Sequence, residues 1–216
     1  DLYITLGNFY LNNQRQDDAV IEIERAVALE PARGAYLFEL GDAYNEVQRP
    51  ADAESAYVQA LVLEPTLEDA YINLGSLYRN QDRGDEAKAI YSQGLAVLPT
   101  SGPLMVEFGE FLINQGELDA GLAMLDQVSK LSPDAQTLAA RAAVYLTLDD
   151  DALAVEGTAN AEATEGDENA LTASQAKALH DLEDARQREP GSVTILIAVG
   201  DLYADLDMKI QAQQAY

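Results

Sequence analysis

The chain has 216 residues, 48% of them apolar and 24% charged, which is the balance of a folded protein, and no apolar run reaches the roughly 18 residues of a membrane span. Its 13 basic and 38 acidic side chains give a formal net charge of −25, which argues against nucleic acid as a direct ligand, because phosphate binding requires a basic surface. Cysteine is absent and His180 is the single histidine, so thiol chemistry is excluded and histidine-based metal or catalytic sites are not expected.

Glycine and proline recur along the chain with a period of 34 residues. The positions that keep this spacing are Gly7, Gly41, Gly75 and Gly109, and Pro31, Pro65, Pro99 and Pro133. A fixed period of this length indicates a stack of small structural units rather than one globular core.

Each period contains two helical patterns. In the first period, one set of residues recurs at i, i+3, i+4 and i+7 and a second set follows at helical spacing: Tyr3, Leu6, Gly7 and Tyr10, and then Ala19, Ile23 and Ala26. The polar segment Asn12–Asp17 separates the two predicted helices, and Pro31 ends the second one because proline lacks an N–H and clashes with the preceding turn. Glycine or alanine between the helices allows their axes to approach closely.

The same pattern returns in later periods with conservative changes. The corresponding residues are Leu37, Leu40, Gly41, Tyr44, Ala53, Tyr57 and Ala60; Tyr71, Leu74, Gly75, Tyr78, Ala87, Tyr91 and Gly94; Met105, Phe108, Gly109, Leu112, Gly121, Leu125 and Val128; and Leu196, Val199, Gly200, Tyr203 and Ala212. This pattern resembles the tetratricopeptide repeat family. The resemblance implies an all-α fold, a right-handed superhelical solenoid of antiparallel helix pairs with about six units.

The period divides the chain into repeats at about 1–33, 34–67, 68–101, 102–134, 135–191 and 192–216. The last repeat is incomplete and the first begins near its second position, which suggests a fragment of a longer chain. Pro133 and Pro190 are 57 residues apart, 23 more than one period, so the fifth repeat carries an insertion at about 150–175. This insertion is rich in acids, alanine, threonine and glycine, and we expect an exposed loop. A calcium site there is a weaker alternative, because no closing glutamate of a calcium loop is present.

The fifth repeat replaces an apolar residue of the pattern with Arg141, on the helix face that meets the second helix. An unpaired charge at that point would be costly. Family resemblance places an aspartate one residue before the large apolar position of the second helix, and here that residue is Asp181. We therefore predict an Arg141–Asp181 pair, with Ala178, Leu182 and Ala185 on the second helix. In the alternative, Ala154–Ala161 fills this place and residues 172–188 pack elsewhere.

The resemblance places ligand contacts on the concave surface, which the first helix of each pair lines. The groove residues that we predict are Asn8, Asn12, Phe38, Glu39, Asp42, Asn45, Asn73, Asn80, Glu107, Glu110 and Asn114, and the same surface includes Leu11, Glu46, Ser76, and the apolar residues Ile72 and Val106. Ile4 and Asp69 stand where carboxylate-clamp members carry basic residues, so a carboxylate clamp is not expected. The amides could bridge a peptide backbone, or could be ordinary polar residues of the helix surface.

The sequence thus predicts a scaffold without enzymatic activity or cofactor, which binds a basic or apolar segment of another protein in an acidic groove. Two alternatives remain open: a targeting region of a larger enzyme such as a glycosyltransferase, and a scaffold for envelope assembly or polysaccharide export in bacteria. A bacterial cytoplasm or periplasm, with envelope association, is compatible with the composition. Exposed ends of a solenoid would also allow self-association.

Overall fold

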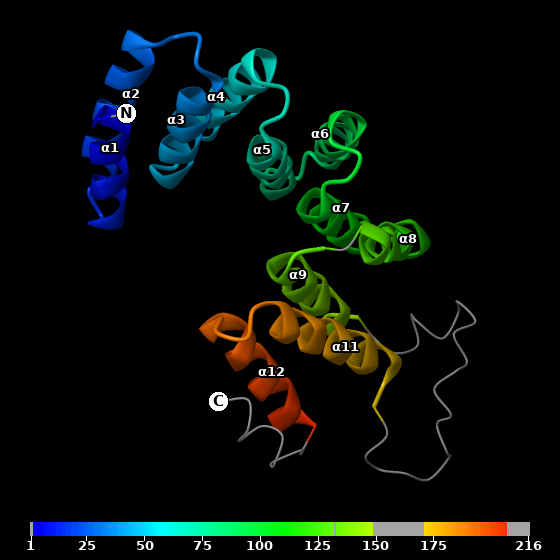
Figure 1. Ribbon diagram of the computed structural model, residues 1–216. Coiled ribbons are helices and arrows are strands. Elements are labelled where there is room, and N and C mark those ends of the chain that lie inside the picture. Colours follow the sequence, from blue (N-terminus) through cyan, green and yellow to red (C-terminus); the bar gives the residue numbers. More distant parts are fainter. Residues whose placement is uncertain (1, 132, 149–170, 207–216) are drawn as a thin grey trace. The chain divides into compact units, whose positions relative to one another are not determined.

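The protein is described from a computed structural model, which describes residues 2–131, 133–148 and 171–206 (Figure 1). Within these ranges the regular structure is helical and contains no strand. The chain divides into two compact units, Asp1–Leu104 and Met105–Tyr216, which we describe separately. The sequence prediction of an all-α repeat fold is confirmed.

The N-terminal unit contains three helix pairs. Their helices are α1 (Leu2–Asn12), α2 (Gln16–Leu29), α3 (Gly34–Glu46), α4 (Pro50–Leu63), α5 (Glu68–Asn80) and α6 (Gly84–Val97). The two helices of each pair pack against each other, and α2 and α4 also pack against the first helix of the following pair, α3 and α5. Each pair therefore buries apolar surface twice, once within the pair and once against its neighbour.

The C-terminal unit continues the same alternation. Its helices are α7 (Gly102–Asn114), inside which the boundary between the units falls, α8 (Leu118–Val128) with a 3-10 turn at Ser129–Leu131, α9 (Ala135–Leu146), α11 (Ala173–Arg188) and α12 (Val193–Asp205). Helix α11 packs against α9 and also against α12. It therefore takes the place of the second helix of the fifth repeat.

The glycines of the period lie where the two helices of a pair come closest. A Cβ atom at Gly41 would lie 2.5 Å from Cε1 of Tyr57, and a Cβ atom at Gly75 would lie less than 3.0 Å from the ring of Tyr91. Both rings are buried. The missing side chain therefore makes room for a tyrosine ring of the partner helix.

The turn inside each pair contains a residue in the left-handed conformation. Gln14, Gln48 and Asp82 have φ of 57–58°, and Gly116 has φ of 82°, so the same turn recurs every 34 residues. Left-handed backbone costs an L residue roughly 1–2 kcal/mol, whereas glycine adopts it readily. The first three turns thus carry a small strain that the fourth avoids.

Replacing Gln14 with glycine is therefore expected to stabilise the protein by up to about 1 kcal/mol, after the greater backbone entropy of glycine in the unfolded chain is subtracted. The measurement is urea denaturation followed by circular dichroism. Gln59 lies in the interior of α4, where the same substitution should destabilise by about 1 kcal/mol. Equal effects at the two sites would contradict the assignment of strain to the turn.

An arginine closes each of these turns in the N-terminal unit. Arg15, Arg49 and Arg83 each stack on a tyrosine of the preceding helix, with Cζ 4.3 Å from the centroid of Tyr10, Tyr44 or Tyr78. Their Nε atoms donate to Asp18, Asp52 and Glu86 at 2.7 Å. Cation–π stacking and these hydrogen bonds together stabilise the conformation of the turn between the two helices of a pair.

The fifth repeat resumes earlier than the sequence predicted. Helix α11 begins at Ala173, behind a capping box in which the Thr172 hydroxyl accepts from the Gln175 N–H and the Gln175 side chain accepts from the Thr172 N–H. Residues 173–175 of the predicted insertion at 150–175 are thus helical, because the cap satisfies the first N–H groups of the helix. The rest of that insertion up to residue 170, with its calcium alternative and the Ala154–Ala161 segment, lies outside the described residues.

The structure brings Arg141 and Asp181 together between α9 and α11. Nε of Arg141 donates to Oδ2 of Asp181 at 2.7 Å, and Nη2 donates to Oδ1 at 2.5 Å, with side-chain exposures of 5% and 3%. Nη1 donates to the Leu125 carbonyl at 3.1 Å and to the Ser129 hydroxyl. Every nitrogen of the buried guanidinium therefore has an acceptor, which is the condition under which a buried ion pair is tolerated.

Candidate functional site

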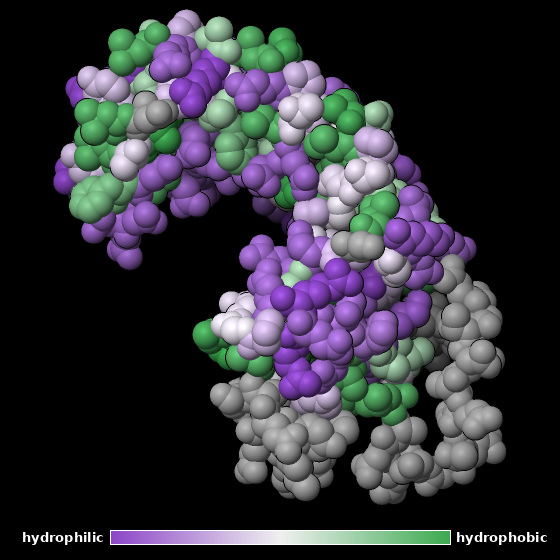
Figure 2. All heavy atoms as spheres, in the orientation of Figure 1, coloured by the Kyte–Doolittle hydropathy of each residue, from purple (hydrophilic) through white to green (hydrophobic). Residues whose placement is uncertain are grey.

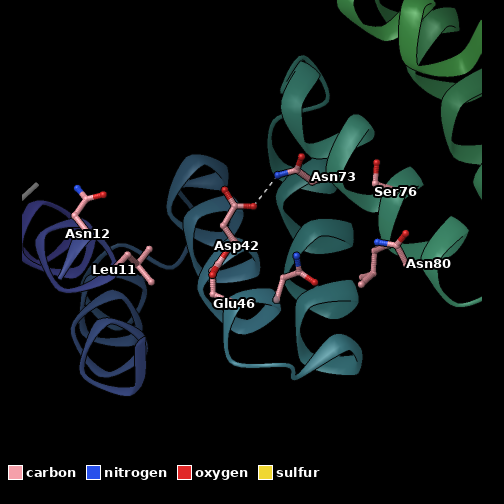
Figure 3. A pocket seen from close by; sticks show the side chains of 9 residues that line it. Leu11, Asn12, Asp42, Glu46, Asn73, Ser76 and Asn80 are labelled. Carbon is pink, nitrogen blue, oxygen red and sulfur yellow. Dashed lines mark hydrogen bonds between the residues drawn. The ribbon is translucent and has the colours of Figure 1, made fainter. Parts of the chain in front are cut away.

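A pocket of about 510 Å³ lies in the N-terminal unit, on the side formed by the first helices of its three pairs (Figure 3). Its lining side chains come from α1, α3 and α5: Leu11, Asn12, Asp42, Asn45, Glu46, Asn73, Ser76, Leu77 and Asn80. Because α1, α3 and α5 lie at the same place in successive repeats, the 34-residue period itself brings residues far apart in sequence to one surface.

Asp42 occupies the middle of the pocket wall and is held from two sides. Its Oδ1 accepts a hydrogen bond from Nδ2 of Asn73 at 2.7 Å (Figure 3). The same Oδ1 accepts another from the Tyr57 hydroxyl at 2.6 Å. Burial raises the pKa of Asp42, and the hydrogen bonds from Tyr57 and Asn73 oppose this effect only in part. Asp42 therefore becomes protonated at a higher pH than an ordinary aspartate.

The chemical character of the lining is acidic and amide-rich. Asp42 and Glu46 are the carboxylates, and no basic side chain lines the pocket. Four asparagines offer both donors and acceptors, which suits the N–H and C=O groups of a peptide backbone. Leu11 and Leu77 add apolar surface. The lining is therefore complementary in charge to a cationic group.

The structure places five of the predicted groove residues in this one pocket: Asn12, Asp42, Asn45, Asn73 and Asn80. Three further members of the predicted surface, Leu11, Glu46 and Ser76, also line it. Leu77 was not predicted, because its helix position is the one that packs against the preceding pair. Its contribution to the pocket depends on three-dimensional packing and has no signal in the 34-residue pattern.

Other predicted residues lie outside the pocket. Phe38 is half-buried beside Tyr57, with ring centroids 6.0 Å apart, and Asn8 and Glu39 belong to the same unit but not to the lining. Glu107, Glu110 and Asn114 lie on α7, in the C-terminal unit. Val106 was predicted to form an apolar patch on the groove, and this was wrong: its side chain is buried, because that face of α7 packs into the protein.

Within the described ranges, no group of three or more histidine, cysteine, aspartate or glutamate side chains is arranged to hold a metal ion. Among the same residues, every helix is too short or too polar to cross a membrane.

Family comparisons agree with this architecture. One tetratricopeptide repeat model matches residues 82–144, and a second model of the same repeat matches residues 1–33. The chain is a tetratricopeptide repeat protein. The curated proteins contain no match to it. The tetratricopeptide repeat fold supports a general role as a protein–protein interaction scaffold.

Several solved structures share the fold of this tetratricopeptide repeat protein. A thermophilic TPR protein of Thermus thermophilus is 18% identical with a TM-score of 0.65, and the match covers 94% of this chain and 97% of that one. Yeast Tom70 is 17% identical with a TM-score of 0.74, covering 99% of this chain and 40% of Tom70. A tetratricopeptide repeat protein of Parabacteroides merdae is 16% identical with a TM-score of 0.62, covering 99% and 75%. At these identities the likeness concerns the fold.

Proposed function

We propose that the protein is a non-enzymatic scaffold whose pocket on α1, α3 and α5 binds a peptide segment of another protein, with a lysine or arginine and an apolar neighbour. The observation that carries this proposal is the lining of the pocket, which has two carboxylates, four asparagines and no basic side chain. The acidic whole chain, at −25, would attract the same kind of segment from a distance.

The roles of the lining residues follow from their bonding. Oδ1 of Asp42 is already occupied by Tyr57 and Asn73, so this carboxylate is held in a fixed orientation. Glu46 is exposed and lies one helical turn further along α3. We infer that Glu46 makes the first contact with the cationic side chain, that Asp42 binds it more deeply, and that Asn45 and Asn80 hydrogen-bond to the peptide backbone.

Replacing Glu46 with lysine is expected to weaken the binding of a lysine-containing peptide about tenfold at low salt, because it removes an attraction and introduces a repulsion in the pocket. Fluorescence anisotropy with labelled peptides, repeated at several salt concentrations, measures this change. The affinity of the unmodified protein should fall as salt rises. Binding of only acidic C-terminal peptides would contradict the proposed ligand.

Asp85 provides the matched control for this experiment. It is an exposed acid in the first turn of α6 and does not line the pocket. Asp85→Lys changes the net charge by the same amount as Glu46→Lys. If both variants lose affinity equally, the effect is one of overall charge and the pocket is not the binding site.

The predicted self-association through exposed ends stays a prediction of the sequence.

A further inference from the structure

The carboxylate of Asp42 has only one oxygen left for a ligand in the pocket. Both lone pairs of Oδ1 are engaged, by the Tyr57 hydroxyl at 2.6 Å and by Nδ2 of Asn73 at 2.7 Å. Among the described residues no group donates to Oδ2, which is turned away from Asn73 in Figure 3. Since none of their buried side-chain oxygens lacks a partner, Oδ2 is accessible to solvent.

A single free oxygen distinguishes between the two cationic side chains. Arginine gains most from a carboxylate when two parallel N–H groups reach both of its oxygens. At Asp42 a second N–H would have to displace Asn73 or Tyr57 from Oδ1. A lysine ammonium is a compact charge whose three N–H groups take single acceptors in different directions. The bonding of Asp42 therefore favours an ammonium over a guanidinium.

The pocket contains further single acceptors for the other N–H groups of an ammonium. Glu46 lies one helical turn from Asp42 on α3, and Asn45 also contributes to the lining. Nδ2 of Asn73 is directed at Asp42, which leaves the amide oxygen of Asn73 as an acceptor. An ammonium at Oδ2 of Asp42 is thus surrounded by a lining that is rich in separate oxygen atoms.

Hydration of the cation does not reverse this preference. An ammonium is more strongly hydrated than a guanidinium, so a dry pocket would favour arginine. This pocket is open, and four of its lining residues are exposed: Asn12, Asn45, Glu46 and Asn80. Figure 2 shows mostly hydrophilic side chains on the side of the N-terminal unit where α3 and α5 lie. A bound ammonium keeps water on that side, and an exposed pair between arginine and Glu46 gains little.

We propose that the pocket on α1, α3 and α5 selects a lysine side chain over an arginine, and that Asn73 and Tyr57 act as positioning residues for this choice by occupying Oδ1 of Asp42. The inference rests on the proposed function, which leaves the cation as either lysine or arginine. It adds the chemical class of the cation, an alkylammonium, and the residues that determine it.

The test uses the whole 216-residue chain and a phage-displayed peptide library. The central residue of each peptide is lysine, arginine or methionine in equal numbers, and the other positions exclude charged residues. Enriched peptides are synthesised with an acetylated N-terminus, and those that Glu46→Lys weakens more than Asp85→Lys are retained, because they bind in the pocket. Fluorescence anisotropy is expected to show about fivefold tighter binding with a central lysine than with a central arginine.

Asn73→Ala tests the cause of the preference. Asn73 lines the pocket, so its removal frees the lone pair of Oδ1 on the pocket side and makes room for a second N–H of arginine. The ratio of the two affinities should fall to about one. Asn80→Ala is the matched control, because Asn80 lines the same pocket without a bond to Asp42. It should leave the ratio unchanged, and circular dichroism verifies that both variants are folded.

The outcomes separate this inference from the proposed function. Equal or tighter binding of arginine to the unmodified protein would overturn the inference and leave a cationic peptide as the ligand. A ratio that Asn73→Ala leaves unchanged, or that Asn80→Ala lowers equally, would overturn the role of Oδ1. Equal binding of lysine and methionine peptides would contradict the proposed function itself. Cadaverine, a free diamine, should compete only weakly; competition as strong as that of the lysine peptide would contradict a peptide as the source of the ammonium.

Discussion

Replacement of Asp181 by alanine is expected to lower the free energy of unfolding by about 3–5 kcal/mol, because it leaves the Arg141 guanidinium buried without its counter-charge. Arg141 and Asp181 are 5% and 3% exposed, so water cannot replace the lost carboxylate without opening the interface between α9 and α11. The measurement is urea denaturation, together with hydrogen exchange of the amides of α9 and α11, since the parts of a repeat protein can unfold separately.

Two further variants make this prediction specific. Asp184 lies on the same helix and pairs with Arg188 at the surface, so Asp184→Ala should cost less than about 1 kcal/mol. In the second pair, Leu40 and Ala56 occupy the positions of Arg141 and Asp181. The double variant Arg141→Leu with Asp181→Ala reproduces that combination and should recover most of the lost stability. A double variant as unstable as Asp181→Ala would show that packing, not the unpaired charge, is responsible.

Replacement of Gly75 by alanine is expected to destabilise the protein by about 1–3 kcal/mol, because the new methyl group would lie less than 3.0 Å from the buried ring of Tyr91. Tyr91 is fully buried, so its ring cannot move without displacing neighbours. Thermal and urea denaturation measure the loss. Gly191 has open space around its Cβ position, and Gly191→Ala should change the stability little.

The fifth repeat indicates how the clash can be relieved. It carries Ala142 where Gly75 stands in the third repeat, and Leu182 where Tyr91 stands, and both are buried. Adding Tyr91→Leu to Gly75→Ala should therefore be less destabilising than the sum of the two single changes, by about 1 kcal/mol or more. If the changes in free energy of unfolding are strictly additive, the size of the side chain at one position does not depend on the side chain at the other.

The sequence predicted the helix pairs well because the period repeats the same local physics. The i, i+3, i+4 and i+7 spacing of Tyr3, Leu6, Gly7 and Tyr10 determines a helix face, and Pro31 determines where the second helix ends. The start of α11 was harder to predict from the sequence, because the capping box of Thr172 and Gln175 lies in a polar segment without apolar periodicity. Local capping chemistry, not the repeat, determines that boundary.

The pocket was predictable to the extent that it follows the period. Asp42, Asn45 and Asn73 were found from their positions in the repeat, and the pocket contains all three. Leu77 was not predicted, because its position depends on how one helix pair packs against the next, and the burial of Val106 was not predicted either. The hydrogen bonds that orient Asp42 likewise join three helices, α3, α4 and α5, and no single stretch of sequence contains them.

The small residue and the large residue that face each other within a hairpin determine how such arrays can be recombined. Gly41 fits Tyr57, Gly75 fits Tyr91, and Ala142 is found with Leu182, so in these three pairs both partners belong to the same hairpin. A chimera with its crossover between two hairpins keeps every such partnership. A crossover inside a hairpin can place alanine opposite tyrosine and create a steric clash. Whole hairpins are therefore the units that gene duplication or shuffling can exchange without separating these partners.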